Sequence, residues 1–232
     1  MKMAVKPLIK HLEELRKRLI FVVLFLFVFF IIGVLFSDFI IKKIISDLVF
    51  ENIEIVALTP TEFILTQIKV GFLAAVVFCF PLIIYELIIF IKPGLNKKER
   101  NAIKLILPSF LVLFLMGIVF SYFIFVRVAL YFLANLSKGV AVNLWGINKF
   151  LSFVFLTCLG FGLIFQMPLF LLILNRLGVI NINYLRKQRR YVYVVLFVLA
   201  ALMTPPDIIT MIMIAVPLIL LYEASLIVLR IF

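Results

Sequence analysis

The chain has 232 residues, of which 66% are hydrophobic and only 15% are charged, and 27 of them are phenylalanine. This composition excludes an ordinary soluble domain, in which about 25% of the residues are charged. The formal net charge of +12 would suit a nucleic-acid-binding protein, but no base-reading or aromatic–basic motif accompanies the basic residues. The sequence therefore predicts an all-α integral membrane protein, with no nucleic acid as a partner.

The leader, residues 1–18, is basic and amphipathic. Its leucines recur at helical spacing, which predicts one apolar stripe on a helix that lies along the cytoplasmic membrane face or packs on a neighbour. The leader also contains two adjacent acids, Glu13 and Glu14, where topology alone favours cations. Each acid can pair with a basic residue four positions later, which stabilises a helix by a few tenths of a kcal/mol. Taken singly, each acid is explained by that pairing.

Six apolar segments follow, and each is interpreted as a membrane-spanning helix. They cover residues 19–36, 70–91, 105–126, 150–174, 191–203 and 208–229. The connections are too short to hold a soluble domain, so residues 1–232 are expected to form a single polytopic membrane domain. Most of the 23 Lys and Arg residues fall in the leader and in the connections after the second and fourth segments. By the positive-inside rule, both termini are expected in the cytoplasm.

Local signals predict where two of the helices start. The connection 37–69 opens with apolar pairs between charges, which is typical of an interfacial helix. Residues 59–62 (TPTE) then combine an N-cap threonine, a proline at the first helical position and a glutamate at the third. They predict a second helix that starts near residue 60. Residues 96–99 (NKKE) repeat the capping pattern before the third helix, so capping is a structural explanation for Glu99.

Prolines lie inside four of the six segments, at Pro81, Pro108, Pro168 and Pro217. A proline inside a helix removes a backbone hydrogen bond and bends the helix. Four bent helices predict a curved, concave wall rather than a straight bundle.

The fifth and sixth segments are predicted to be short. Segment 191–203 spans roughly 20 Å as a helix, against a hydrocarbon core about 30 Å thick. The sixth offers only 15 residues, 208–222, before Glu223. The hairpin at residues 204–207 is therefore drawn toward the bilayer centre. Either the membrane thins there or the hairpin is sheltered in protein, and local thinning is the prediction.

Three polar residues, Glu86, Gln166 and Glu223, lie inside apolar segments near their cytoplasmic ends. A carboxylate in hydrocarbon costs several kcal/mol, so these groups are expected to face a cavity, a partner or water, or to be protonated. One interpretation is a polar pocket in the inner half of the wall. The other is that the two glutamates reach the interface or pair with Arg190 or Arg230, and that Gln166 makes a helix–helix hydrogen bond.

Taken together, the acids of the predicted cytoplasmic face suggest more than pairing. Only Glu13, Glu14 and Glu99 lie there among many basic residues. If Glu14 and Glu99 converge, they form a small anionic spot inside a cationic rim. Such a spot suits guanidinium groups, which bind carboxylates through two parallel hydrogen bonds.

Four motifs occur in register along the chain: HLEELRKRL before the first segment, KPGLNKKER after the second, FGLIFQMP in the fourth and LMTPPD after the fifth. Over essentially its whole length the chain resembles TatC, the signal-peptide receptor and core subunit of the twin-arginine protein translocase. The resemblance implies binding of the twin-arginine signal peptides of folded cargo, assembly with the single-span partners TatA and TatB, and self-association in the complex. It also implies transport driven by the proton-motive force, with no enzyme activity and no cofactor.

The resemblance also implies roles for particular residues. The implied signal-peptide contacts are Glu14, Arg16, Phe90, Pro93, Leu95 and Glu99. The outer-turn motif tied to activity in the family matches Pro205, Pro206 and Asp207. Gln166 departs from the family, in which many members have glutamate, so a role there that needs an ionisable group is not expected.

Other functions have weaker support. A secondary transporter would place Glu86, Gln166 and Glu223 along a midplane path, but the six segments show no obvious internal repeat. An intramembrane enzyme lacks any nucleophile–base or metalloprotease motif, and His11 is the single histidine. Cys79 and Cys158 lie in apolar segments and are expected to pack, with no metal site. A structural scaffold would not require the acids. The leader is not expected to be a cleaved signal peptide, and the short termini favour a prokaryotic plasma membrane, whose lipids are further partners.

Overall fold

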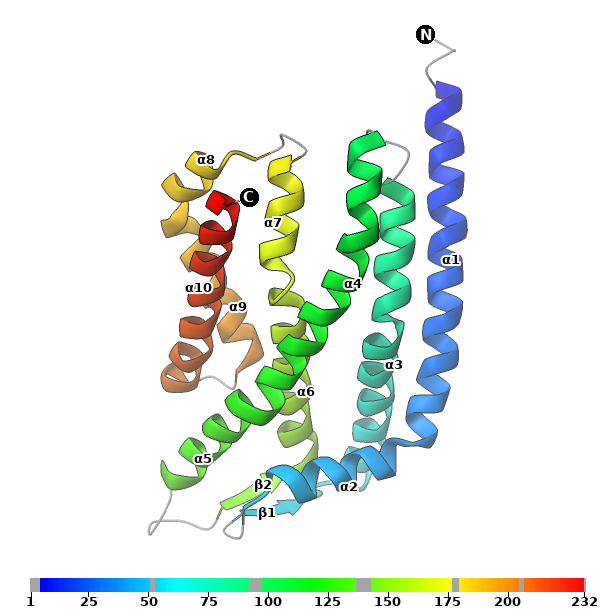
Figure 1. Ribbon diagram of the computed structural model, residues 1–232. Helices are drawn as coiled ribbons and strands as arrows, with labels where there is room; N and C mark the ends of the chain where they lie inside the picture. The colour runs from blue at the N-terminus through cyan, green and yellow to red at the C-terminus, as the bar shows by residue number, and fades with distance from the viewer. Residues whose placement is uncertain are drawn as a thin grey trace. The chain divides into compact units, whose positions relative to one another are not determined.

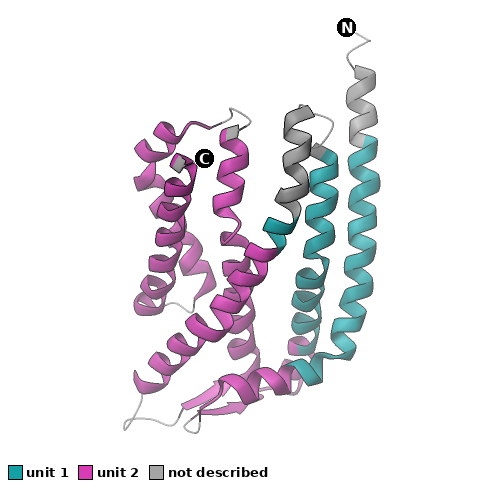
Figure 2. Cartoon of the chain, in the orientation of Figure 1, with its two compact units in different colours: residues 1–40, 67–111 teal, residues 41–66, 112–232 magenta. Residues whose placement is uncertain are grey.

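In a computed structural model of the chain, the described residues are helical except for two short strands and parts of the connecting segments (Figure 1). The structure describes residues 5–50, 53–91, 97–136, 143–176, 180–204 and 207–231. These residues form two compact units (Figure 2). Unit 1 comprises residues 1–40 and 67–111, and unit 2 comprises residues 41–66 and 112–232.

Unit 1 is built on two long helices, α1 (Val5–Leu35) and the part of α3 (Pro60–Ile91) after residue 66. The leader and the first span form the single helix α1, so the leader is not an element of its own. The two helices touch through their backbones, because a Cβ atom added to Gly33 would lie 2.7 Å from the carbonyl oxygen of Gly71. Small residues permit this close approach of helices in a membrane, where packing replaces the hydrophobic effect between helices.

Unit 2 begins within α2 (Ser37–Leu48), the helix predicted for the start of the 37–69 connection. The short strand β1 (Ile53–Val56) pairs in parallel with β2 (Asn143–Gly146), and Ile53 lies opposite Asn143. The helix α3 begins at Pro60, which confirms the start predicted from the TPTE motif. The pairing of β1 with β2 joins segments about 90 residues apart and was not predicted.

The third segment is longer than predicted and is not one regular helix. It comprises α4 (Lys97–Phe120), the π-helical turn η2 (Ser121–Val126) and α5 (Arg127–Leu136). The start at Lys97 agrees with the NKKE capping signal. The predicted end at residue 126 was wrong, because the helix continues past Arg127 to Leu136. The Arg127 guanidinium lies over the ring of Phe123, 5.6 Å from its centroid.

The fourth segment is interrupted. It comprises α6 (Ile147–Ile164) and α7 (Met167–Arg176), with a turn at Phe165 and Gln166 between them. Pro168 therefore lies in the first turn of α7 rather than inside a continuous helix, where its missing N–H costs little. The other three prolines, Pro81, Pro108 and Pro217, lie inside α3, α4 and α10.

The chain ends in α8 (Ile182–Lys187), α9 (Arg189–Met203) and α10 (Ile208–Ile231). Among the residues that the structure describes, five helical stretches are long and apolar enough to span a membrane. The fifth predicted segment is helical, but α9 has only 15 residues and is not among the five. The sixth segment was predicted to be short, and this was wrong. The helix α10 has 24 residues and continues past Glu223 to Ile231. In unit 2, α10 packs against α7 and α9, and Tyr222 and Leu218 are buried there.

Candidate functional site

The predicted cytoplasmic end of unit 1 holds a cluster of two acids around one arginine. The helix α1 presents Glu14 and Arg18 one turn apart, and α3 presents Glu86. The Arg18 guanidinium donates to Glu14 Oε1 over 2.6 Å and to Glu86 Oε2 over 2.5 Å. The side chains of Arg18 and Glu86 are 22% and 13% exposed, so the contact is largely withdrawn from solvent. We call these three residues the Arg18 cluster.

The Arg18 cluster corrects one prediction and confirms another. Glu86 was expected to reach the interface or to pair with Arg190 or Arg230, but its ion-pair partner is Arg18. The helical pair of Glu14 with Arg18 is confirmed. Sequence reasoning missed the third member because Arg18 and Glu86 are 68 positions apart. Only the packing of α1 on α3 brings them together.

The other predicted signal-peptide residues are placed in part. Arg16 is exposed on α1, and Phe90 is partly exposed one turn after Glu86 on α3. Pro93 and Leu95 lie outside the described residues. Glu99 lies on α4, but its side chain is also outside the part that the structure describes. The convergence of Glu14 with Glu99 therefore stays a prediction.

A second polar cluster lies in unit 2, at the start of α9. Glu223 on α10 accepts a hydrogen bond from the Tyr193 hydroxyl over 2.5 Å and pairs with Arg189 over 2.8 Å. The expected ion-pair partners of Glu223 were Arg190 or Arg230. Both were wrong, because the partner is Arg189. Arg190 instead donates to the hydroxyl of Tyr191. The contacts of Glu223 fasten α9 to α10 where α9 begins.

Gln166 occupies the turn between α6 and α7 and is 7% exposed. Its side-chain nitrogen donates to the carbonyl oxygen of Gly162, one turn earlier in the chain, over 3.3 Å. The residue therefore stabilises the interruption between the two helices. Its proposed contact with a partner helix stays a prediction.

Asp207 caps the last helix. Its carboxylate accepts hydrogen bonds from the backbone N–H groups of Ile209 and Thr210, over 3.2 Å and 3.0 Å, just before α10 begins. The hydrogen bond from the Thr210 side chain, followed by these two N–H groups, lowers the pKa of Asp207 from its ordinary value. Pro205 and Pro206, the other members of the outer-turn motif, lie outside the described residues.

Glu62 has a larger role than the capping predicted for it. The residue is 8% exposed, and its carboxylate accepts from the N–H of Leu58 over 2.7 Å and from the N–H of Asn148 over 3.1 Å. A further hydrogen bond comes from the N–H of Thr59. One acid thus joins the start of α3 to the start of α6, next to the paired strands. Nearby in the chain, Asp47 of α2 accepts from Tyr122 of η2 over 3.0 Å.

In the described part of the chain, no three His, Cys, Asp or Glu side chains lie close enough together to hold a metal ion. The two cysteines, Cys79 and Cys158, are buried and unbridged. These thiols therefore pack as small apolar side chains.

Comparison with known proteins identifies the family. The family model described as "Sec-independent protein translocase protein (TatC)" matches residues 10–217. The chain is 38% identical over 229 residues to the Sec-independent protein translocase protein TatCy of Bacillus subtilis, covering 98% of this chain and 90% of that protein. It is 34% identical over 219 residues to the Sec-independent protein translocase protein TatC of Halalkalibacterium halodurans, covering 94% and 87%.

The fold agrees with this result. The crystal structure of a twin arginine translocase receptor, TatC, superimposes on the chain with a TM-score of 0.89 and 31% identity, covering 95% of this chain and 98% of that one. Together with the five candidate spans, these matches describe a multi-pass membrane protein of a transport family. The chain belongs to the TatC family of Sec-independent protein translocase proteins.

Proposed function

We propose that the chain is the core subunit of a twin-arginine translocase and receives the arginines of twin-arginine signal peptides at its cytoplasmic face. Glu14 and Glu99 are the proposed acids, with Arg16, Phe90, Pro93 and Leu95 as further contacts. The observation that carries the proposal is the Arg18 cluster. Glu14 and Glu86 already bind a guanidinium, so the chemistry required of the site is present on α1 and α3.

The Arg18 cluster also explains how an arginine can be told from a lysine. A guanidinium is planar and carries five donors in a fixed fork, whereas an ammonium is a compact point charge. Arg18 uses this fork to reach carboxylates on two different helices. An arriving signal-peptide arginine competes for Glu14 with Arg18, and a lysine cannot reproduce the same two-sided contact.

The topology proposed for this function has six spans and two cytoplasmic termini in a prokaryotic plasma membrane. In this arrangement α9 is the fifth span, added to the five longer candidate spans. Its 15 residues extend about 22 Å, so the bilayer thins around it. Thinning lowers the barrier to passage of a folded protein. The prolines inside α3, α4 and α10 and the turn before α7 bend the spans into a concave wall against which the apolar part of the signal lies. The family model runs through both compact units, which supports their action as one membrane domain.

The proposed partners are twin-arginine signal peptides, single-span subunits of the TatA and TatB type, lipids and further copies of the chain. Gln166, Glu86 and Glu223 are the proposed intramembrane polar contacts, and Pro205, Pro206 and Asp207 form the proposed outer-turn activity motif. The proton-motive force drives transport, with no catalytic step and no cofactor. The translocase names of the relatives support a place for the chain in a translocase complex.

The test is binding of a fluorescent twin-arginine signal peptide to the detergent-purified protein. The same peptide with Lys-Lys in place of Arg-Arg serves as the ligand control. Glu14→Gln and Glu99→Gln are expected to weaken twin-arginine binding, whereas Glu13→Gln is the matched control because Glu13 is exposed on the same helix. Equal binding of both peptides, unchanged in Glu14→Gln and Glu99→Gln, would leave these acids as helix caps and ion-pair partners and would refute the proposal.

A further inference from the structure

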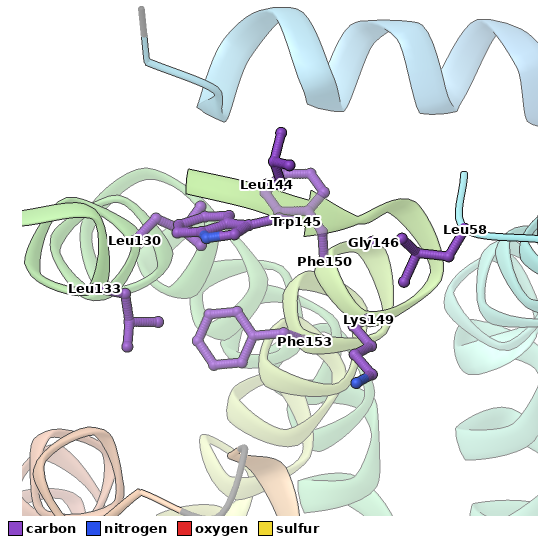
Figure 3. Close-up of a pocket in the computed structure, with 9 residues that line it drawn as sticks. All are labelled: Leu58, Leu130, Leu133, Leu144, Trp145, Gly146, Lys149, Phe150 and Phe153. Atoms are coloured by element: carbon purple, nitrogen blue, oxygen red, sulfur yellow. The ribbon is translucent and has the colours of Figure 1, made fainter. Parts of the chain in front are cut away.

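Unit 2 contains a pocket of about 360 Å³ beside the paired strands (Figure 3). This volume lies within the range of about 300–1,000 Å³ that is typical of ligand sites. The walls come from α5, β2 and α6, with Leu58 at one edge. Apart from Lys149, every lining residue is apolar or glycine. Figure 3 shows the rings of Trp145 and Phe153 between Leu133 on one side and Lys149 on the other.

The pocket lies where two candidate spans end. Leu133 is near the end of the span Pro108–Leu136, and Lys149 and Phe153 are near the start of the span Ile147–Asn175. Trp145 comes just before that second span. Tryptophan and lysine are the residues found where the hydrocarbon core meets the lipid headgroups. The position of the pocket at the ends of these spans therefore favours the level of the headgroups.

Lys149 gives the pocket its charge. The residue is exposed, and within the described residues its ammonium makes no ion pair closer than 4 Å. Glu62 is close enough to attract it, but the Glu62 carboxylate already accepts hydrogen bonds from three backbone N–H groups. An ammonium has three donors and no acceptor. The cation at the edge of the apolar wall is thus suited to an anion that is attached to an apolar tail.

We propose that this pocket binds one anionic phospholipid, with its phosphate on Lys149 and an acyl chain along Trp145 and Phe153. A peptide fits less well, because every lining side chain except Lys149 is apolar and offers no partner to polar peptide side chains. A lipid without net charge would pack against the apolar wall but would gain no net electrostatic attraction from Lys149. The proposal goes beyond the signal-peptide function and does not depend on it, because the pocket contains none of the proposed signal-peptide residues.

The fluorescence of Trp145 measures lipid binding, because Trp145 is the one tryptophan in the sequence. The purified, delipidated protein in detergent is titrated with phosphatidylglycerol that carries bromine on its acyl chains, which quenches nearby tryptophan on contact. Brominated phosphatidylcholine is the zwitterionic control. Quenching is expected to saturate at several-fold lower lipid fraction with phosphatidylglycerol, and unbrominated phosphatidylglycerol is expected to reverse it.

Variants assign the preference to the pocket. Lys149→Gln is expected to abolish the difference between the two lipids, and Lys149→Arg is expected to retain it. Lys42→Gln is the matched control, because Lys42 is an exposed lysine of α2 that does not line the pocket. An unchanged emission spectrum in the absence of lipid shows that each variant keeps the environment of Trp145.

Three results would overturn the proposal. The first is equal quenching by the two lipids in the unmodified protein. The second is a phosphatidylglycerol preference that survives in Lys149→Gln or disappears equally in Lys42→Gln. The third is reversal by unbrominated phosphatidylcholine as effective as that by phosphatidylglycerol. None of these results bears on signal-peptide binding, which is measured separately with the twin-arginine and Lys-Lys peptides.

Discussion

Glu86 of α3 accepts a hydrogen bond from Arg18 of α1 over 2.5 Å, although the two residues are 68 positions apart. The same guanidinium binds Glu14, so one cation bridges two acids on two helices. The resting protein therefore holds an arginine of its own where the proposed function requires an arginine of the signal peptide. An arriving guanidinium has to share or exchange these carboxylates.

Removal of Arg18 separates its competition with a signal-peptide arginine from its contribution to stability. Arg18→Gln is expected to raise the affinity for a twin-arginine peptide several-fold, because Glu14 and Glu86 then face each other without a cation. The same change is expected to lower the thermal unfolding temperature, since the ion pair between α1 and α3 is lost. Peptide titration and thermal unfolding in detergent measure the two effects. Lys17→Gln, which removes an exposed charge from the neighbouring position, is the control. An affinity that falls in Arg18→Gln would show that Arg18 supports binding rather than competing with it.

Gly117 lies where α4 meets α6 backbone to backbone. A Cβ atom added there would be 2.7 Å from the carbonyl oxygen of Phe161 and 2.9 Å from Cα of Gly162. Gly117→Ala is therefore expected to destabilise the protein by about 1–3 kcal/mol, the cost of overpacking a rigid contact. Gly160→Ala is the control, because its Cβ would meet the flexible end of Met203, which can move aside. Reversible unfolding in a denaturant series compares the two, and equal losses would contradict a backbone contact at Gly117.

Asp207 stabilises the start of α10 through its carboxylate. Asp207→Ala is expected to cost about 1 kcal/mol of stability, as for other N-caps, whereas Asp207→Asn keeps most of the effect. The folded-state pKa is lowered, so the contribution is fully present above the ordinary pKa of an aspartate and is lost as the pH falls through the lower, folded value. The stability difference between the unmodified protein and Asp207→Ala should therefore shrink in acid. A difference that is constant from neutral to strongly acidic pH would exclude this role of the carboxylate.

Glu62 joins the starts of α3 and α6 because a carboxylate only accepts hydrogen bonds. A glutamine has one acceptor oxygen and an NH₂ group that cannot accept from a backbone N–H. Glu62→Gln is thus expected to leave a backbone N–H of Leu58 or Asn148 without its partner and to lower the thermal unfolding temperature clearly. Glu54→Gln on the exposed face of β1 should leave it unchanged. Equal unfolding temperatures for the two variants would show that Glu62 does not hold the two helix starts together.

Local signals in the sequence predicted much of the helical structure. The motifs at Pro60 and Lys97 gave two helix starts correctly, and the charge spacing gave the pair of Glu14 with Arg18. These features depend on residues within one or two helical turns of each other, so the local sequence is enough to predict them.

Features that depend on distant neighbours could not be predicted in the same way. The π-helical turn at Ser121 and the turn at Gln166 occur inside apolar runs that read as continuous helix. The partners of Glu86 and Glu223 were wrong because several arginines are close in sequence and only helix packing selects one. The strand pair β1–β2 has too few residues to give a hydrophobic alternation. In each case the deciding contact is tertiary.

The most direct test of the receptor proposal is a double-mutant cycle between Glu14 and the arginines of a signal peptide. The affinities of the unmodified protein and of Glu14→Gln are measured for the twin-arginine peptide and for a peptide in which one arginine is replaced by citrulline, which keeps the shape and removes the charge. The account predicts a coupling of about 1 kcal/mol or more, because each single change breaks the same charge-assisted hydrogen bond. Strictly additive losses would mean that Glu14 does not contact the signal arginines, and the central claim would be wrong.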